Sequence, residues 1–94
     1  MPDGMAYIPG VSLHARQRMI ERHGRDLTAA EWLTAVMDIL DGRAKLLRAI
    51  PGESEIYLVV IGDLPLRLIW RPELAAVMTV MADEMKLPRA VRRA

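Results

Sequence analysis

The stretch EIYLVVIGDLPLRLIWR, residues 55–71, decides the fold of this chain. Its first seven residues are rich in β-branched and aromatic side chains, which strands favour, and GDLP then marks a turn. The six residues LRLIWR alternate between two faces, with Leu66, Leu68 and Trp70 on one and Arg67, Ile69 and Arg71 on the other. Because a short connection favours antiparallel pairing, the stretch predicts a β-hairpin.

A further strand is predicted on each side of this hairpin. RAKLLRAI, residues 43–50, precedes it across the turn PGES, and AAVMTVM, residues 75–81, follows it across the turn RPEL. Two helices are predicted before the strands. We therefore expect an α+β fold in which two N-terminal helices pack on a four-stranded antiparallel sheet. The residues expected to be largely buried are Trp32, Val36, Ile39, Leu58, Val60 and Leu68.

Both predicted helices carry clear end signals. Ser12 is a suitable N-cap for a helix that runs to about His23, where Gly24 provides the stop. TAAE, residues 28–31, is a capping box that begins a second helix, which ends before Gly42. The apolar face of this second helix indicates that it packs on the core.

The length of 94 residues predicts one domain. We expect an extended N-terminal segment over residues 1–11, the folded domain over residues 12–82 and a basic, mobile or briefly helical tail over residues 83–94. The chain has no cysteine, which excludes disulfides and thiolate chemistry, and its net charge is only +1. No apolar run is long enough to span a bilayer, so we expect a soluble, cytoplasmic protein.

Ionisable side chains are concentrated in SLHARQRMIERHG, residues 12–24. At about 100° per residue, His14, Arg18, Glu21 and Arg25 form one stripe with Arg22 beside it, while Arg16 and His23 lie on the other side and are expected to face solvent. His14 lies in the first turn of this helix, where a cation interacts unfavourably with the helix dipole. The stripe is either a solvated helix face or the border of a cleft, and in the second case His14, Arg18 and Arg22 face the last strands.

Other candidate residues lie on the strands. Arg67 and Arg71 share a strand face and, with Arg25, are candidates for binding an anion; an exposed sheet face is the simpler interpretation. Thr79 is the hydroxyl of the last strand, where it is either an ordinary strand residue or a hydrogen-bond donor to a ligand. The two histidines and the absence of cysteine match no metal-ligand spacing, so no metal or cofactor is expected.

The pattern S-x-H-A-x-x-R-M-x-E-R, residues 12–22, resembles the opening helix of a small bacterial and phage domain family of uncharacterised function. VMTV, residues 77–80, is similar to the last strand of that family, and the order of elements agrees over about residues 11–81. The family looks related to the metal-independent ribonuclease superfamily that includes barnase, colicin D and the RelE-type toxins. The sequence HGRDLT, residues 23–28, departs from the family pattern by two extra residues.

The resemblance implies a role for four residues of this chain. His14 would be the general acid or base, Arg18 and Arg22 would stabilise the phosphorane, and Thr79 would donate a hydrogen bond to a phosphate oxygen. RNA cleavage by 2′-hydroxyl attack needs a base, an acid and positive charge, and it needs no metal. The second proton-transfer group could be Glu21, Tyr57 or an arginine–water arrangement.

We therefore expect a ribonuclease-like, toxin-type domain that acts on RNA phosphodiesters. The alternative is a non-catalytic interaction module of a phage or mobile element that binds a host protein or nucleic acid through its arginines. A purely structural protein is a third hypothesis. The sequence does not predict an oligomeric state.

Overall fold

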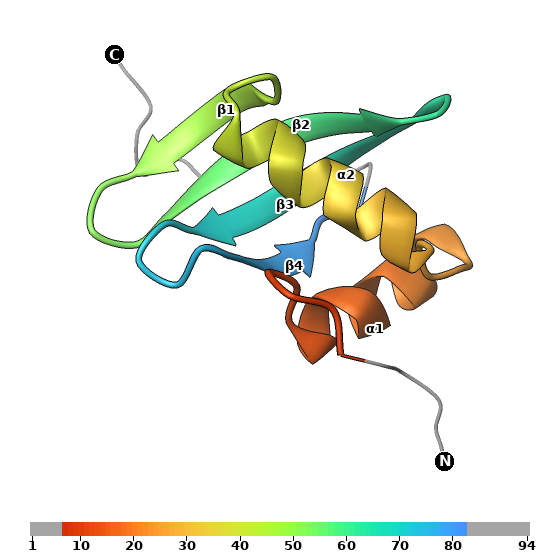
Figure 1. Ribbon diagram of the computed structural model, residues 1–94. Coiled ribbons are helices and arrows are strands. Elements are labelled where there is room, and N and C mark those ends of the chain that lie inside the picture. The colour runs from red at the N-terminus through yellow and green to blue at the C-terminus, as the bar shows by residue number, and fades with distance from the viewer. Residues whose placement is uncertain (1–6, 83–94) are drawn as a thin grey trace.

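The computed structural model describes residues 7–82 and confirms the predicted α+β fold (Figure 1). The two helices precede the four strands along the chain. The elements are α1 (Leu13–His23), α2 (Ala29–Leu40), β1 (Lys45–Ile50), β2 (Ser54–Ile61), β3 (Leu64–Arg71) and β4 (Ala76–Val80). The predicted basic tail over residues 83–94 lies outside the described residues.

Helix α1 begins and ends where its sequence predicts. The Ser12 hydroxyl accepts a hydrogen bond from the Ala15 N–H at 2.9 Å, which satisfies one of the unpaired donors of the first turn. Gly24 ends the helix in the left-handed conformation with φ 85°, a region that glycine enters without steric cost. Ala15 and Met19 are the buried residues of α1 and form its contact with the core.

Helix α2 begins with the predicted capping box. The Thr28 hydroxyl accepts from the Glu31 N–H, and the Glu31 carboxylate accepts from the Thr28 N–H. The apolar face of α2 consists of Trp32, Ala35, Val36 and Ile39, all of which are buried. Leu33 and Met37 stay exposed because they lie on the side of α2 away from the sheet.

The four strands form an antiparallel meander in the order β1-β2-β3-β4. The strands β2 and β3 pair without interruption from Glu55 opposite Trp70 to Ile61 opposite Leu64. Irregularities interrupt the β1–β2 and β3–β4 ladders, between Leu46 and Arg48 in the first and between Ile69 and Trp70 in the second. These shifts change which face of the sheet the flanking residues occupy.

The expected burial in β2 is wrong for two of its residues. Val60 is 54% exposed and Leu58 is only half-buried, whereas Val59 and Ile61 belong to the core. The reason is the side-chain period of two in a strand, because neighbouring residues point to opposite faces. Trp32, Val36, Ile39 and Leu68 are buried as expected.

The segment before α1 packs against the domain. Ile8 and Val11 are buried in the core, and Val11 forms a parallel bridge with Val77. Gly10 has φ 80°, and a Cβ at this position would meet the Val36 methyl groups at 3.2–3.3 Å. Glycine therefore allows the chain to pass close to α2 before it enters α1.

We predict that Met19→Ala lowers the free energy of unfolding by about 2–5 kcal/mol, because the Met19 side chain is fully buried and its removal leaves a cavity. Ile20→Ala is the matched control on the same helix, since Ile20 is 41% exposed, and it should cost about 0.5 kcal/mol. Urea denaturation measures both values. Equal losses for the two variants would show that α1 does not pack as described.

Candidate functional site

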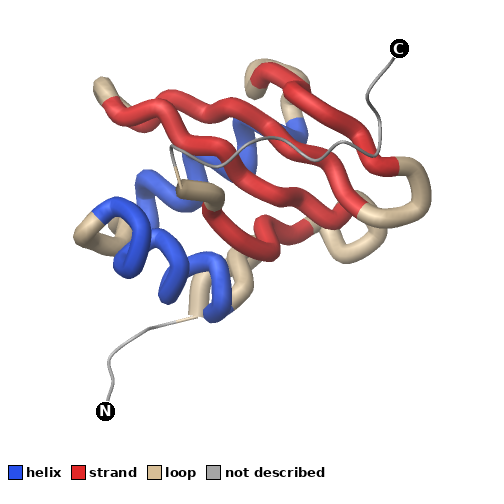
Figure 2. The backbone as a smooth tube through the Cα atoms, turned by 180° about the vertical axis from the view of Figure 1, so that it is seen from behind, coloured by secondary structure: helices blue, strands red, loops and turns tan. Residues whose placement is uncertain are grey.

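The register of the sheet separates two faces of different chemistry. Directly opposed residues of an antiparallel pair project to the same face. Val59 lies opposite Leu66 and Tyr57 opposite Leu68, and this face packs against α2. Seen from behind in Figure 2, α2 lies behind the strands, so none of the described helices covers the near face.

One row of opposed residues crosses all four strands on this second face. Arg48 lies opposite Ile56, Ile56 opposite Ile69, and Ile69 opposite Thr79. On the same face, Leu58 lies opposite Lys45 on one side and Arg67 on the other. Arg71 lies opposite Ala76. We call this surface the arginine face, and it consists of Lys45, Arg48, Ile56, Leu58, Arg67, Ile69, Arg71 and Thr79.

The arginine face has an apolar floor and a cationic rim. Ile56 is fully buried, and Ile69 beside it is half-buried. The strands contain a single carboxylate, Glu55, and its position opposite Trp70 places it on the α2 face. Positive side chains therefore occupy this face of the strands without an acidic strand residue among them.

Hydrogen bonds hold two of its arginines in place. The Arg67 Nη2 atom donates to the Ala82 carbonyl at 3.1 Å, and the Arg71 Nη2 atom donates to the Glu73 carboxylate at 2.9 Å. Within the described part of the chain, the Nε atoms of Arg48 and Arg71 are buried and have no hydrogen-bond partner. A buried donor without an acceptor is costly, so the Nε atoms of these two arginines weaken the packing of this face.

Arg22 lies against the last strand of the sheet. Its Nη1 atom donates to the Val80 carbonyl at 2.7 Å, and the Ser12 hydroxyl donates to the Met78 carbonyl at 3.0 Å. Both acceptors belong to β4, the last strand of the sheet. Ser12 and Arg22 therefore hold α1 along the outer edge of β4.

The prediction that Arg16 and His23 face solvent is wrong. The Arg16 side chain is 11% exposed and forms an ion pair with Asp26 at 2.7 Å. The Nε2 atom of His23 lies 3.3 Å from the Met81 carbonyl. The Asp26 carboxylate also accepts hydrogen bonds from the Trp32 indole and the Leu27 N–H, both at 2.8 Å. This network connects α1 to α2, which a side chain in solvent would not do.

His14 and Arg18 occupy the opposite flank of α1. At about 100° per residue, His14 and Arg16 lie on either side of the buried Ala15, and the Arg16 flank is the one joined to α2. His14 and Arg18 therefore point away from α2. The His14 side chain is exposed, while Arg18 is partly exposed and forms an ion pair with Glu21.

Arg25 belongs to the start of α2. Its guanidinium forms an ion pair with Glu31 at 3.1 Å. The hydrogen bond from Arg25, followed by that from the Thr28 backbone, holds the pKa of the Glu31 carboxyl below its ordinary value. Arg25 thus reinforces the capping box, and its charge is already matched by Glu31.

The structure brings together only part of the predicted site. Arg67, Arg71 and Thr79 share the arginine face, and Arg22 reaches the backbone of the strand that carries Thr79. Among the described residues, no hydrogen bond or ion pair joins His14, Arg18 or Arg25 to this group. Lys45 and Arg48 are the residues that the sequence reasoning missed. Both are basic residues of the predicted strand KLLRAI. Simple alternation would place Lys45 and Arg48 on opposite faces, but the irregularity between Leu46 and Arg48 brings them to the same face.

Tyr57 cannot assist at Thr79, because it lies on the α2 face of β2. Its hydroxyl donates to the Glu55 carboxylate at 2.8 Å. Burial, and after it the contact with Glu55, raises the pKa of Tyr57, so its hydroxyl stays protonated at neutral pH. Glu21 is engaged with Arg18 on α1. Neither residue is placed as the second proton-transfer group.

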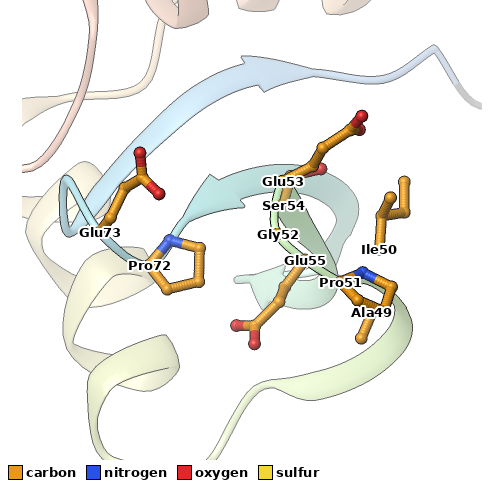
Figure 3. Close-up of a pocket in the computed structure, with 9 residues that line it drawn as sticks. All are labelled: Ala49, Ile50, Pro51, Gly52, Glu53, Ser54, Glu55, Pro72 and Glu73. Atoms are coloured by element: carbon orange, nitrogen blue, oxygen red, sulfur yellow. The ribbon is translucent and has the colours of Figure 1, made fainter.

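A hollow of about 250 Å³ lies at one end of the sheet, between the β1–β2 and β3–β4 turns (Figure 3). Three glutamates, Glu53, Glu55 and Glu73, are among its lining residues. None of the predicted site residues lines it, and its carboxylates disfavour an anion. Glu73 also pairs with Arg71, so the hollow borders the arginine face at that residue.

Residues 7–82 contain no group of three or more His, Asp or Glu side chains arranged to hold a metal ion. No helix in the same range is long and apolar enough to cross a membrane. In comparisons with protein families, curated proteins and solved structures, nothing matches this chain.

We predict that Asp26→Ala lowers the free energy of unfolding by about 3 kcal/mol or more, because it leaves the Arg16 charge and the Trp32 indole without their shared acceptor. Asp38→Ala is the matched control. Asp38 pairs with Arg43, whose side chain is 61% exposed, so this loss should be about 1 kcal/mol or less. Chemical denaturation measures both, and similar losses would contradict the assigned role of Asp26.

Proposed function

We propose that this domain binds RNA through the arginine face. The observation that carries the proposal is the set of three arginines and Thr79 on one sheet face, where no strand residue supplies a carboxylate and Arg71 is paired with Glu73 of the following turn. Arginine suits phosphate because its planar guanidinium donates two parallel hydrogen bonds to it. The threonine hydroxyl adds a neutral donor of the kind that contacts the phosphate and sugar backbone.

The positions of two arginines bear on the proposal. The Arg71 side chain is 36% exposed, so a phosphate can reach its guanidinium beside Glu73. Arg67 is fixed at the Ala82 carbonyl, so its position is set before a ligand binds. The resemblance of residues 12–22 and 77–80 to a family that looks related to ribonucleases supports RNA as the anionic partner over a host protein.

RNA cleavage without a metal is the second candidate function, with His14 as the general acid or base. The imidazole is exposed on the flank of α1 that points away from α2, and α1 packs against β4, the strand of Thr79. Histidine changes protonation near neutral pH and can exchange a proton with a ribose hydroxyl. Arg18 on the same flank, and the arginines of the sheet, would stabilise negative charge on the phosphorane.

We predict that the double variant Arg48→Gln/Arg67→Gln weakens RNA binding and its dependence on salt. Each lost phosphate contact reduces the slope of log K against log[salt] by about 0.7–0.9, so two contacts remove about 1.4–1.8. Fluorescence anisotropy of a labelled RNA across a salt series measures the slope. Arg43→Gln is the control, since Arg43 pairs with Asp38 and Asp41 away from this face.

An unchanged slope in the double variant would contradict the proposed interface. Thermal denaturation of each variant separates this result from a loss of folding. If the wild-type protein binds no RNA at low salt, the proposal is wrong.

For the second candidate, we predict that wild-type protein cleaves RNA in the presence of EDTA and that His14→Ala reduces the rate by roughly 100- to 10,000-fold. Gln17→Ala, an exposed change on the same helix, should leave the rate unchanged. The assay follows the cleavage of a 5′-labelled RNA over time. Absence of cleavage by the wild-type protein would exclude the catalytic candidate and leave the binding proposal standing.

A further inference from the structure

The aromatic residues of this chain all lie off the arginine face. The sequence has only two tryptophans and two tyrosines, and it has no phenylalanine. Trp32 is buried in the core, and Tyr57 and Trp70 lie on the α2 face of the sheet. Tyr7 precedes the segment that packs before α1 and belongs to no strand. The apolar side chains among the arginines are therefore aliphatic, with Leu58 and Ile69 half-buried and Ile56 fully buried beneath them.

This composition bears on which form of RNA the face can hold. Proteins that bind single strands place aromatic rings where the unstacked bases lie, because stacking replaces the base–base contacts that the strand has lost. An aliphatic floor provides no such stacking. A double helix keeps its bases stacked inside and presents phosphates and 2′-hydroxyl groups, which arginine and threonine side chains contact.

The arrangement of the cations points the same way. Arg67 and Arg71 are four residues apart on β3, which places their Cα atoms roughly 14 Å apart along the strand. Arg48 lies on β1, two strands away from β3, so it is displaced across the sheet by roughly 10 Å. The charges thus spread in two directions. A single strand follows one line, whereas a duplex presents two backbones side by side.

From these observations we infer that the arginine face takes double-helical RNA and contacts it through the backbone without base preference. This inference rests on the proposed RNA binding and names the form of RNA. Thr79, at the end of the row that begins with Arg48, donates to a phosphate or 2′-hydroxyl oxygen.

The test compares a 16-base-pair RNA duplex with each of its separated strands by fluorescence anisotropy at the same salt concentration. We expect the duplex to bind at least tenfold more tightly than either strand, and a second duplex of unrelated sequence to bind within about threefold of the first. Arg48→Gln should weaken duplex binding, while Arg43→Gln should leave it unchanged. A DNA duplex of the same sequence should bind more weakly, because it lacks the 2′-hydroxyl groups.

Single strands that bind as tightly as the duplex would overturn the inference but leave the proposed RNA binding intact. Failure of every RNA to bind would overturn both. Equal binding of an acidic polypeptide such as polyglutamate would show a general polyanion surface, and it would also overturn the inference.

Discussion

The outer edge of β4 is the constraint on which the rest of the structure depends. A strand at the edge of a sheet exposes backbone groups that would pair with another chain. Here the Ser12 N–H donates to the Val77 carbonyl at 3.0 Å, the Val77 N–H donates to the Gly10 carbonyl at 2.8 Å, and the Arg22 guanidinium covers the Val80 carbonyl. The first helix and the segment before it therefore complete the sheet, and α1 is fixed at its edge.

With α1 held at the edge, α2 is the only described helix that covers a face of the sheet. The Asp26 network fixes the connection between the two helices, because one carboxylate joins the Arg16 side chain to the Trp32 indole. The face opposite α2 then carries the arginines of β1 and β3. The charge cluster of α1 is divided: Arg16, Arg22 and His23 contact other elements, while the other ionisable residues stay on the outer flank of the helix.

The sequence predicted the fold well where its patterns were unambiguous. The capping box at Thr28, the stop at Gly24 and the alternation over residues 66–71 all describe local structure, and the structure confirms each of them. The prediction of which β2 residues face the core was wrong because residues 56–61 are uniformly apolar or aromatic. No polar residue there marks the face, and only the pairing with β3 decides it.

The candidate site was predicted only in part, and the reason is distance along the chain. Arg22 contacts a carbonyl 58 residues away, which no helix periodicity reveals, and Arg16 reaches Asp26 in a loop beyond the helix. Arg48 and Thr79 lie in the same row of the sheet, but two strands separate them and the β1–β2 ladder is irregular, so the sequence does not show their relation. Arg67 and Arg71 were found because their alternation is complete within one strand.

The most direct test of the arginine face as the binding surface is a ¹H–¹⁵N NMR titration with a short RNA duplex, following the arginine Nε–Hε signals. The account predicts that the signals of Arg48, Arg67 and Arg71 shift together and saturate at one concentration, while the signal of Arg43 stays in place. Shifts confined to Arg18 and other residues of α1, with the three strand arginines unmoved, would contradict it.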